Sequence, residues 1–253
     1  MPPSADSRWA ITFDVEWAHP EVLDDVVRLL AERNLRATFF CTHDGIALPG
    51  HERALHPNFR RQRNSVLEGL NPDQLSRWTD IEFYRFVVRS TRAFCPEAVG
   101  VRAHCRFYDH ELLPVYREAG FEYDSTDLSP LSADLAPEWK GHDILALPMY
   151  YMDHWDLGAQ ATDLTLPRLQ PDRPGLKIVD FHPNLVFLNA ASIEQYRASK
   201  PHYREPVRLR KLRHPGRGVR TLLLELLDFL AGRRGAVSTL GEVNAQYRKA
   251  VPC

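Results

Sequence analysis

The sequence lacks the features that mark several large classes of protein. Only four of its 253 residues are cysteines, and no two of these (Cys41, Cys95, Cys105 and Cys253) form a CxxC pair, so neither a zinc knuckle nor a redox dithiol is indicated. No apolar run approaches the roughly 20 residues that a transmembrane helix needs. The first residues do not combine a basic stretch with an apolar one, so no secretory signal is expected. We therefore expect a cytoplasmic protein with reduced thiols.

An excess of charge of either sign is missing as well. The 32 Lys and Arg residues are balanced by 33 Asp and Glu residues, which leaves a net charge of −1. This balance argues against a nucleic-acid partner and against an anionic membrane surface. Internal repeats and low-complexity linkers are also absent from the sequence. Because 44% of the residues are hydrophobic and can fill one large core, we expect a single domain over residues 1–253.

Strand and helix patterns alternate in what is present. An apolar strand pattern covers residues 9–13, and a helix with apolar residues at helical spacing runs from Pro20 to about Asn34. A second strand pattern follows at 36–42 after a very short loop, and a strand, helix and strand in this order imply a parallel pair. Further strands are predicted at 99–103, 121–124, 144–148 and 176–181, and further helices at 73–95, 109–119 and 218–230. The predicted fold class is α/β with a parallel barrel.

Two long segments carry no such pattern. Residues 43–72 are polar and are predicted to form a long loop. Residues 197–220 hold nine Lys or Arg residues and one acid, Glu205, with three prolines among them. This basic segment is interpreted either as a solvated surface loop or as a mobile lid whose cations meet a phosphorylated or acidic substrate.

Acids, histidines and one arginine cluster where the predicted strands end. Since active sites of parallel β/α folds form at the carboxyl ends of the strands, we expect these side chains to meet at one mouth of the barrel. The residues concerned are Asp14, Glu16, His51, His56, Arg102, His104, Asp153, His154, Asp180 and His182.

Several short motifs follow one another in the order known from one family of enzymes. They are Thr12-Phe13-Asp14, Ala37-Thr38-Phe39-Phe40, residues 50–56 from Gly50 to His56, Val101-Arg102-Ala103-His104, residues 119–124 and Val179-Asp180-Phe181-His182-Pro183. Together they resemble the motifs of the NodB-homology polysaccharide deacetylases, carbohydrate esterase family 4. The stretch from His56 to Phe59 and the later Leu188-Asn189 are similar to a branch found in lipopolysaccharide and O-antigen gene clusters. The resemblance implies an irregular, NodB-like (β/α)7 barrel and removal of N-acetyl groups from sugars.

The sequence departs from the family pattern in two places. The usual pair of adjacent aspartates is replaced by Asp14 and Glu16, which should face the same way because residues two apart on a strand do so. The usual second histidine of the second motif is missing, because Arg60 stands four residues after His56. We expect His104 to replace it, with His51 as the alternative.

The resemblance implies a role for each of these residues. Glu16, His56 and His104 would hold a divalent metal ion, most plausibly zinc, since catalytic zinc sites have three nitrogen or oxygen ligands from the protein. Asp14 would act as the base and Arg102 would keep it ionised. His182 would protonate the leaving amine. The residues expected to bind substrate are Asn58, Tyr150, Asp153, His154 and Trp155.

The predicted function is removal of an N-acetyl or other N-acyl group from an amino sugar or glycan precursor, including nucleotide- or lipid-linked forms. Two alternatives stay open at this point. The missing histidine would fit a metal-free pseudoenzyme that only binds glycans, and the barrel would also fit a metal-dependent amidohydrolase that cleaves another C–N bond. Each site residue also has a purely structural interpretation, such as a strand-end cap for Asp14 or a core histidine for His104.

Overall fold

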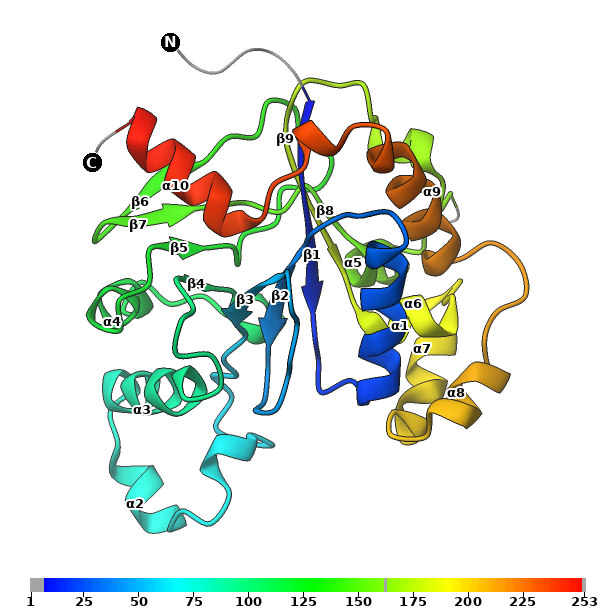
Figure 1. Ribbon diagram of the computed structural model, residues 1–253. Coiled ribbons are helices and arrows are strands. Elements are labelled where there is room, and N and C mark those ends of the chain that lie inside the picture. Colours follow the sequence, from blue (N-terminus) through cyan, green and yellow to red (C-terminus); the bar gives the residue numbers. More distant parts are fainter. Residues whose placement is uncertain (1–6, 162, 252–253) are drawn as a thin grey trace.

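The structure is a computed structural model, which describes residues 7–161 and 163–251 (Figure 1). Cys253, which the sequence analysis expects to be reduced, lies outside the described residues. The strands are β1 Ser7–Asp14, β2 Thr38–Cys41, β3 Glu52–Leu55, β4 Gly100–Val101, β5 Tyr123–Asp124, β6 Glu138–Gly141, β7 Ile144–Ala146, β8 Tyr151–Met152 and β9 Gly175–Phe181. The helices are α1 Pro20–Ala31, α2 Pro72–Arg77, α3 Asp80–Arg92, α4 Leu112–Glu118, α5 Asp153–Gly158, α6 Pro183–Leu188, α7 Ile193–Ser199, α8 Pro206–Lys211, α9 Val219–Ala231 and α10 Leu240–Ala250.

The strands form one sheet in the order β6-β7-β5-β4-β3-β2-β1-β9-β8. Every described pair of neighbouring strands is parallel except β6 with β7. The connections between most of these parallel strands carry helices, as parallel pairs require. The predicted α/β class is therefore confirmed.

A single chain segment, residues 144–152, joins the two ends of this sheet. Its first part is β7, which pairs with β5, and its last part is β8, which pairs with β9. Between them Met149 forms a parallel bridge with Leu128, and Tyr150 N–H donates to the carbonyl of Ile178. Counted as one strand, this segment closes a ring of seven, since β6 stands outside the ring. The predicted irregular (β/α)7 barrel is confirmed in this form.

β1 and β9 lie side by side in the middle of the sheet and are almost completely buried. Their register pairs Ser7 with Gly175 and continues to Phe13 opposite Phe181. Both strands are apolar on both faces, apart from a few polar residues, because each is covered by side chains on both sides, as parallel strands usually are. The ends of β1 and β9 therefore have fixed positions at the centre of the sheet, and the site residues follow them.

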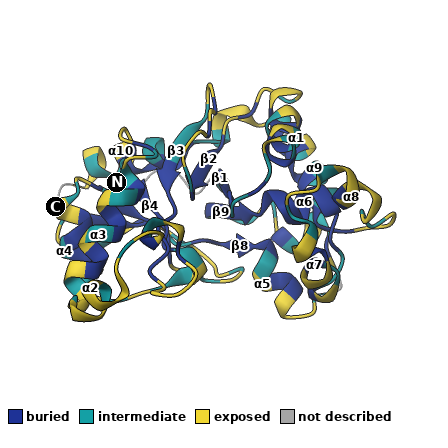
Figure 2. Cartoon of the chain, turned by 90° about the horizontal axis from the view of Figure 1, so that it is seen from below, coloured by how far each residue is buried: buried dark blue, intermediate teal, exposed yellow. Residues whose placement is uncertain are grey.

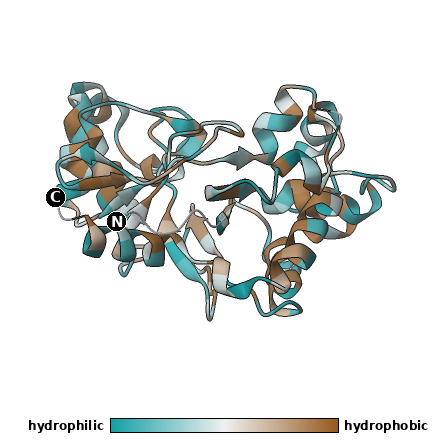
Figure 3. Cartoon of the chain, turned by 90° about the horizontal axis from the view of Figure 1, so that it is seen from above, coloured by the Kyte–Doolittle hydropathy of each residue, from teal (hydrophilic) through white to brown (hydrophobic). Residues whose placement is uncertain are grey.

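Helices cover the outside of the barrel and bury one face each. α1, α6 and α9 pack against one another on one side, while α3 and α4 pack together on the other (Figure 1). Seen from the end at which β1 finishes, the strands are dark and buried and the outer faces of the helices are exposed (Figure 2). From the opposite end, the helices carry hydrophobic and hydrophilic residues in alternation (Figure 3). α9 shows why, since its buried Leu residues recur at helical spacing.

Two predictions about long irregular segments are wrong. The segment 43–72 is not one loop, because β3 lies within it and pairs with β2. The basic segment 197–220 is not a plain loop either, because it holds the end of α7, a 3-10 turn at Lys200–His202 and α8. Several of its cations are occupied by ion pairs, among them Arg210 with Glu21 and Arg220 with Asp25.

The described part of the chain contains no helix that combines the length and the apolar character needed to cross a membrane.

Candidate active site

The register of β1 and β9 brings the predicted polar residues together. Thr12 lies opposite Asp180, and its hydroxyl donates to Asp180 Oδ1 at 2.9 Å. Asp14 and His182 stand two residues further along their chains, so they reach the same level at the end of the two strands. Asp14, Asp180 and His182 are all buried, and their ligand atoms lie within 4.8 Å of one another.

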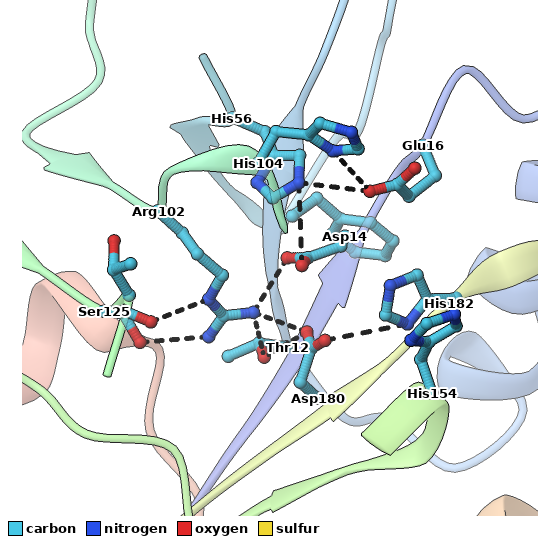
Figure 4. Close-up of polar contacts among 12 residues, drawn as sticks. Thr12, Asp14, Glu16, His56, Arg102, His104, Ser125, His154, Asp180 and His182 are labelled. Carbon is cyan, nitrogen blue, oxygen red and sulfur yellow. Dashed lines mark hydrogen bonds and ion pairs between the residues drawn. The ribbon is translucent and has the colours of Figure 1, made fainter. Parts of the chain in front are cut away.

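Arg102, directly after β4, crosses the interior of the barrel and holds two of these carboxylates (Figure 4). One guanidinium nitrogen, Nη1, lies 2.8 Å from Asp14 Oδ1 and 2.5 Å from Asp180 Oδ1. The other two nitrogens donate to the carbonyl and the hydroxyl of Ser125. The guanidinium also lies 4.0 Å above the centre of the Phe40 ring. The predicted contact between Arg102 and Asp14 is therefore present.

Burial and the shared arginine act on the two aspartates in opposite senses. Burial alone would raise the pKa of Asp14, but His56 and Arg102 beside it leave its pKa below the usual value. For Asp180, burial and the neighbouring charge of Asp14 raise the pKa well above the usual value. Asp14 is thus the ionised member of the pair and Asp180 the neutral one, which suits Asp14 as a proton acceptor.

A left-handed turn, and not the strand, brings Glu16 to the mouth. β1 ends at Asp14, and both Glu16 and Trp17 have positive φ angles of 50° and 53°. The predicted reason, alternation along a strand, is therefore wrong, although Glu16 does lie beside Asp14. Residues without a glycine's freedom hold this conformation at a cost of about 1 kcal/mol or more, which is tolerated mainly where position matters for function.

Glu16 meets the two predicted histidine ligands. Its Oε1 lies 2.8 Å from His104 Nδ1 and 3.3 Å from His56 Nε2. His56 Nε2 is also 3.7 Å from Asp14 Oδ2. Burial would raise the pKa of Glu16, but the two imidazoles hold its pKa well below the usual value. One carboxylate and two imidazoles in mutual contact could hold a divalent metal ion, since their ligand atoms lie within 4.8 Å of one another.

Of the two alternatives for the second histidine, His104 lies with His56, whereas β3 separates His51 from it. His56 follows β3 and His51 precedes it, so the two lie at opposite ends of the strand. His51 Nδ1 accepts a hydrogen bond from the backbone N–H of Ala37, at 3.2 Å. His104, in the turn after β4, lies beside both Glu16 and His56.

His182 is held by Asp153 on the other side of Asp14. Asp153 Oδ1 lies 2.7 Å from His182 Nδ1, and Asp153 Oδ2 accepts from the backbone N–H of His182 at 2.8 Å. Burial alone would lower the pKa of His182, but the Asp153 carboxylate raises it to about 10. His182 is therefore protonated near neutral pH, as a general acid must be.

A pocket of about 740 Å³ opens onto these groups. Asp14, Glu16, His104 and His182 form its floor. Of the residues predicted to bind substrate, His154 and Trp155 line this pocket, and Trp155 is 42% exposed.

The other three predicted substrate contacts are wrong or displaced. Tyr150 is buried, and its hydroxyl donates to the carbonyl of Leu169, away from the pocket. Asp153 lies behind His182 and is fully buried. Asn58 borders an adjoining pocket, but its side-chain oxygen accepts from Arg60 N–H and its nitrogen donates to the Arg63 carbonyl, so it shapes the turn.

Asp180 was expected at a strand end, but no role was predicted for it. Its position two residues before His182, on the same face of the strand, was the available signal. Arg197 and Lys200, which line the pocket, begin the basic segment that was interpreted as a loop or a lid, but Arg60 and Arg106, which line it too, were not predicted as part of the site. Nothing in their local sequence separates them from ordinary surface cations.

Comparison with known proteins gives one family. Residues 11–200 match the model of the family described as WbmS-like polysaccharide deacetylase. A solved structure from Bordetella bronchiseptica, described as a polysaccharide deacetylase involved in O-antigen biosynthesis, is similar with 30% identity and a TM-score of 0.75, over 90% of this chain and 93% of that one. One from Mycobacterium smegmatis shares the fold, with 18% identity and a TM-score of 0.57, over 99% and 93% of the two chains. No curated protein matches the sequence at a significant level.

Proposed function

Because the chain belongs to the WbmS-like family of polysaccharide deacetylases, and is thus a hydrolase, we propose that it removes the N-acetyl group of an amino sugar with the help of a divalent metal ion. One observation carries this proposal. A carboxylate with two imidazoles lies on one side of the ionised Asp14, and the protonated His182 lies on the other. Asp14, Glu16, His104 and His182 line one pocket large enough for a sugar residue, and His56 contacts Glu16 beside it.

The residues present fit a metal ion. Glu16, His56 and His104 supply one oxygen and two nitrogen donors, which is a typical ligand set of catalytic zinc. The other ring nitrogen of His56, Nδ1, is buried without a hydrogen-bond partner among the described residues. When bound, a divalent ion activates water and polarises the carbonyl of the amide. With His104 in the place of the missing histidine, the donor set is complete, which argues against a metal-free pseudoenzyme.

The chain's own groups then move the protons. Asp14 takes the proton of the attacking water, and Arg102 keeps the Asp14 carboxylate ionised and oriented. His182 gives its proton to the leaving amine, and Asp153 keeps His182 charged and aimed. Trp17 and Trp155 offer flat apolar surfaces at the pocket for the sugar ring.

The substrate follows from the relative in Bordetella, which is described in terms of O-antigen biosynthesis. We assign to this chain an amino sugar in a glycan or in a nucleotide- or lipid-linked precursor. The cytoplasm, expected from the sequence, is the matching place of action.

The test combines metal analysis with an activity assay. Protein purified without chelator should contain about one equivalent of zinc or another divalent ion and should release acetate from N-acetylated sugars. His56→Ala should lose the metal and the activity, whereas His51→Ala should keep both, since His51 lies at the far end of β3. Full metal content in His56→Ala, or none in the wild type, would contradict the proposed site.

A further inference from the structure

The pocket that holds the reacting groups is unusually basic for this protein. Arg60, Arg106, Arg197 and Lys200 line it, against only two acids, Asp14 and Glu16. The whole chain has a net charge of −1, so the pocket departs from the balance of charge in the chain. A divalent ion at Glu16 would increase this excess further.

The two acids of the pocket cannot neutralise the four cations, because both are already engaged. Asp14 is bound by Arg102, and Glu16 contacts His56 and His104. None of the four cations forms an ion pair or a side-chain hydrogen bond with a described residue, whereas Arg210 and Arg220 nearby in the sequence pair with Glu21 and Asp25. Their positive charge is therefore free for a ligand.

Local structure places these cations and leaves their donors open. Arg106 follows Cys105 in a left-handed turn, with φ angles of 53° and 56°, and its guanidinium lies 4.7 Å from the centre of the Trp155 ring. A guanidinium stacked by its face keeps its N–H edge available for an oxyanion. Lys200 is three residues after Arg197, and its Nζ lies 5.0 Å from the centre of the Tyr196 ring.

We propose that the substrate carries an anionic group, a carboxylate or a phosphate, near the acylated amine, and that Arg106, Arg197 and Lys200 bind it. This inference rests on the proposed function for the position of the amine in the pocket. A planar carboxylate or a phosphate accepts bidentate hydrogen bonds from Arg, whereas a neutral sugar leaves all these cations without a counter-charge. Arg60, which also lines the adjoining pocket, extends the same basic lining.

The proposal also revises the role of the basic segment 197–220. Only Arg197 and Lys200, at its start, line the pocket. Arg208, Arg210 and Lys211 lie on α8, outside the residues that line the pocket, and Arg210 is paired with Glu21. The residues of α8 therefore provide a matched control, since they carry the same charge in the same segment.

The test measures binding to protein carrying Asp14→Asn, in which turnover is blocked. Three probes are titrated by calorimetry: N-acetylglucosamine, N-acetylglucosamine 1-phosphate and N-acetylglucosaminuronic acid. At least one charged probe should bind about tenfold or more tightly than the neutral one, and the difference should shrink with added salt because exposed charges are screened. The charged probe with the higher affinity shows whether the anionic group of the substrate is a phosphate or a carboxylate.

Substitutions then locate the effect. Arg197→Gln with Lys200→Gln, and separately Arg106→Gln, should remove most of the charged probe's advantage while leaving the affinity for N-acetylglucosamine within about twofold. The triple control Arg208→Gln, Arg210→Gln and Lys211→Gln should leave the advantage intact. Equal or absent binding of charged and neutral probes, or an equal loss in the triple control, would overturn the inference.

A separate measurement tests the proposed function. Acetate release from the same three probes by metal-loaded wild-type protein reports on it alone. Preferential binding of a charged probe without any acetate release would leave the anion site standing and reject the deacetylase assignment of this pocket.

Discussion

At the scale of single residues, Arg102 distinguishes two aspartates that the sequence presents as equals. It lies between Asp14 and Asp180, fully buried, and bonds both through the same nitrogen. One positive charge cannot neutralise two buried negative ones, so the site favours a single ionised carboxylate. Asp14, which also faces His56, is the one that stays charged.

A pair of identical substitutions tests this distinction. Asp14→Asn should lower kcat by about 10²- to 10⁴-fold, the range expected for loss of a general base, because an amide cannot accept the proton. Asp180→Asn makes the same chemical change on the other side of Arg102, where the carboxyl is already neutral, so it should lose far less activity. Steady-state rates at saturating metal give both values. Comparable losses in the two variants would mean that the base has been misassigned.

The contact between Asp153 and His182 predicts a pH effect. Asp153 raises the pKa of His182 to about 10, so the acid form persists until alkaline pH. In Asp153→Asn the stabilising charge is gone and burial lowers the pKa, so the proton is lost at lower pH. The alkaline limb of the kcat/KM profile should move down by about one unit or more. Asp156→Asn, which breaks the ion pair with Arg168 on the same helix, should leave the limb in place.

The motifs of Asp14, Arg102 and His182 survive in the sequence, so their positions at the mouth of the barrel could be predicted, and their contacts suit the roles that we propose for them. His104 could be predicted only as one of two alternatives. His51 and His56 are five residues apart and look like one cluster until β3 is seen to separate them. Tyr150 was expected to bind substrate but is buried, because an aromatic side chain packs into a core as readily as it lines a pocket.

At the scale of elements, the prediction succeeded where a pattern was long. β1, α1 and α9 extend over eight or more residues, and each was predicted nearly in full. β3 has four residues and β8 only two, which is too short for a periodic pattern to be recognised. The turns that position Glu16 and Arg106 depend on positive φ angles at residues other than glycine, which the sequence does not announce.

The end of α6 offers a prediction about stability. Asn189, in a left-handed conformation, donates to the carbonyls of His214 and Gly216 and accepts from the N–H of Thr221. Asn189→Ala would leave these groups unpaired, so the free energy of unfolding should fall by about 2 kcal/mol or more. Asn71→Ala removes only an exposed cap from α2 and should cost about 0.5–1 kcal/mol. Chemical denaturation measures both losses. If Asn189→Ala lowers the free energy of unfolding by less than Asn71→Ala, the hydrogen bonds of Asn189 do not stabilise the end of α6 as proposed.

At the scale of the whole molecule, alternating strands and helices were enough to predict a parallel barrel. The way in which the ring closes was not predicted. The sequence indicated a strand at 144–148, whereas in the structure the pairing continues to residue 152. Its continuation depends on backbone hydrogen bonds with Asp127, Ser129 and Ile178, partners far away in the sequence. The positive charge of the pocket was not predictable for the same reason, since its cations come from three separate segments, at Arg60, at Arg106 and at Arg197 with Lys200.

The segment 144–152, which closes the ring of strands, forms a junction between the two ends of the sheet, here called the seam. Met149 is held by backbone hydrogen bonds with Asp127 and Ser129, and Tyr150 by hydrogen bonds with Leu131 and Ile178. These pairings are short, whereas β1 is paired along most of its length, so the ring should open first at the junction. Native-state hydrogen exchange should therefore find the amides of these two residues less protected than that of Ile11 in β1. Equal protection would show that the barrel opens only as a whole. Asp153 directly follows the seam, so each opening would also release His182 from its partner. The time for which the segment 144–152 stays paired would then set how long His182 remains protonated and oriented. Substitutions in this segment would change catalysis although its residues do not contact the substrate.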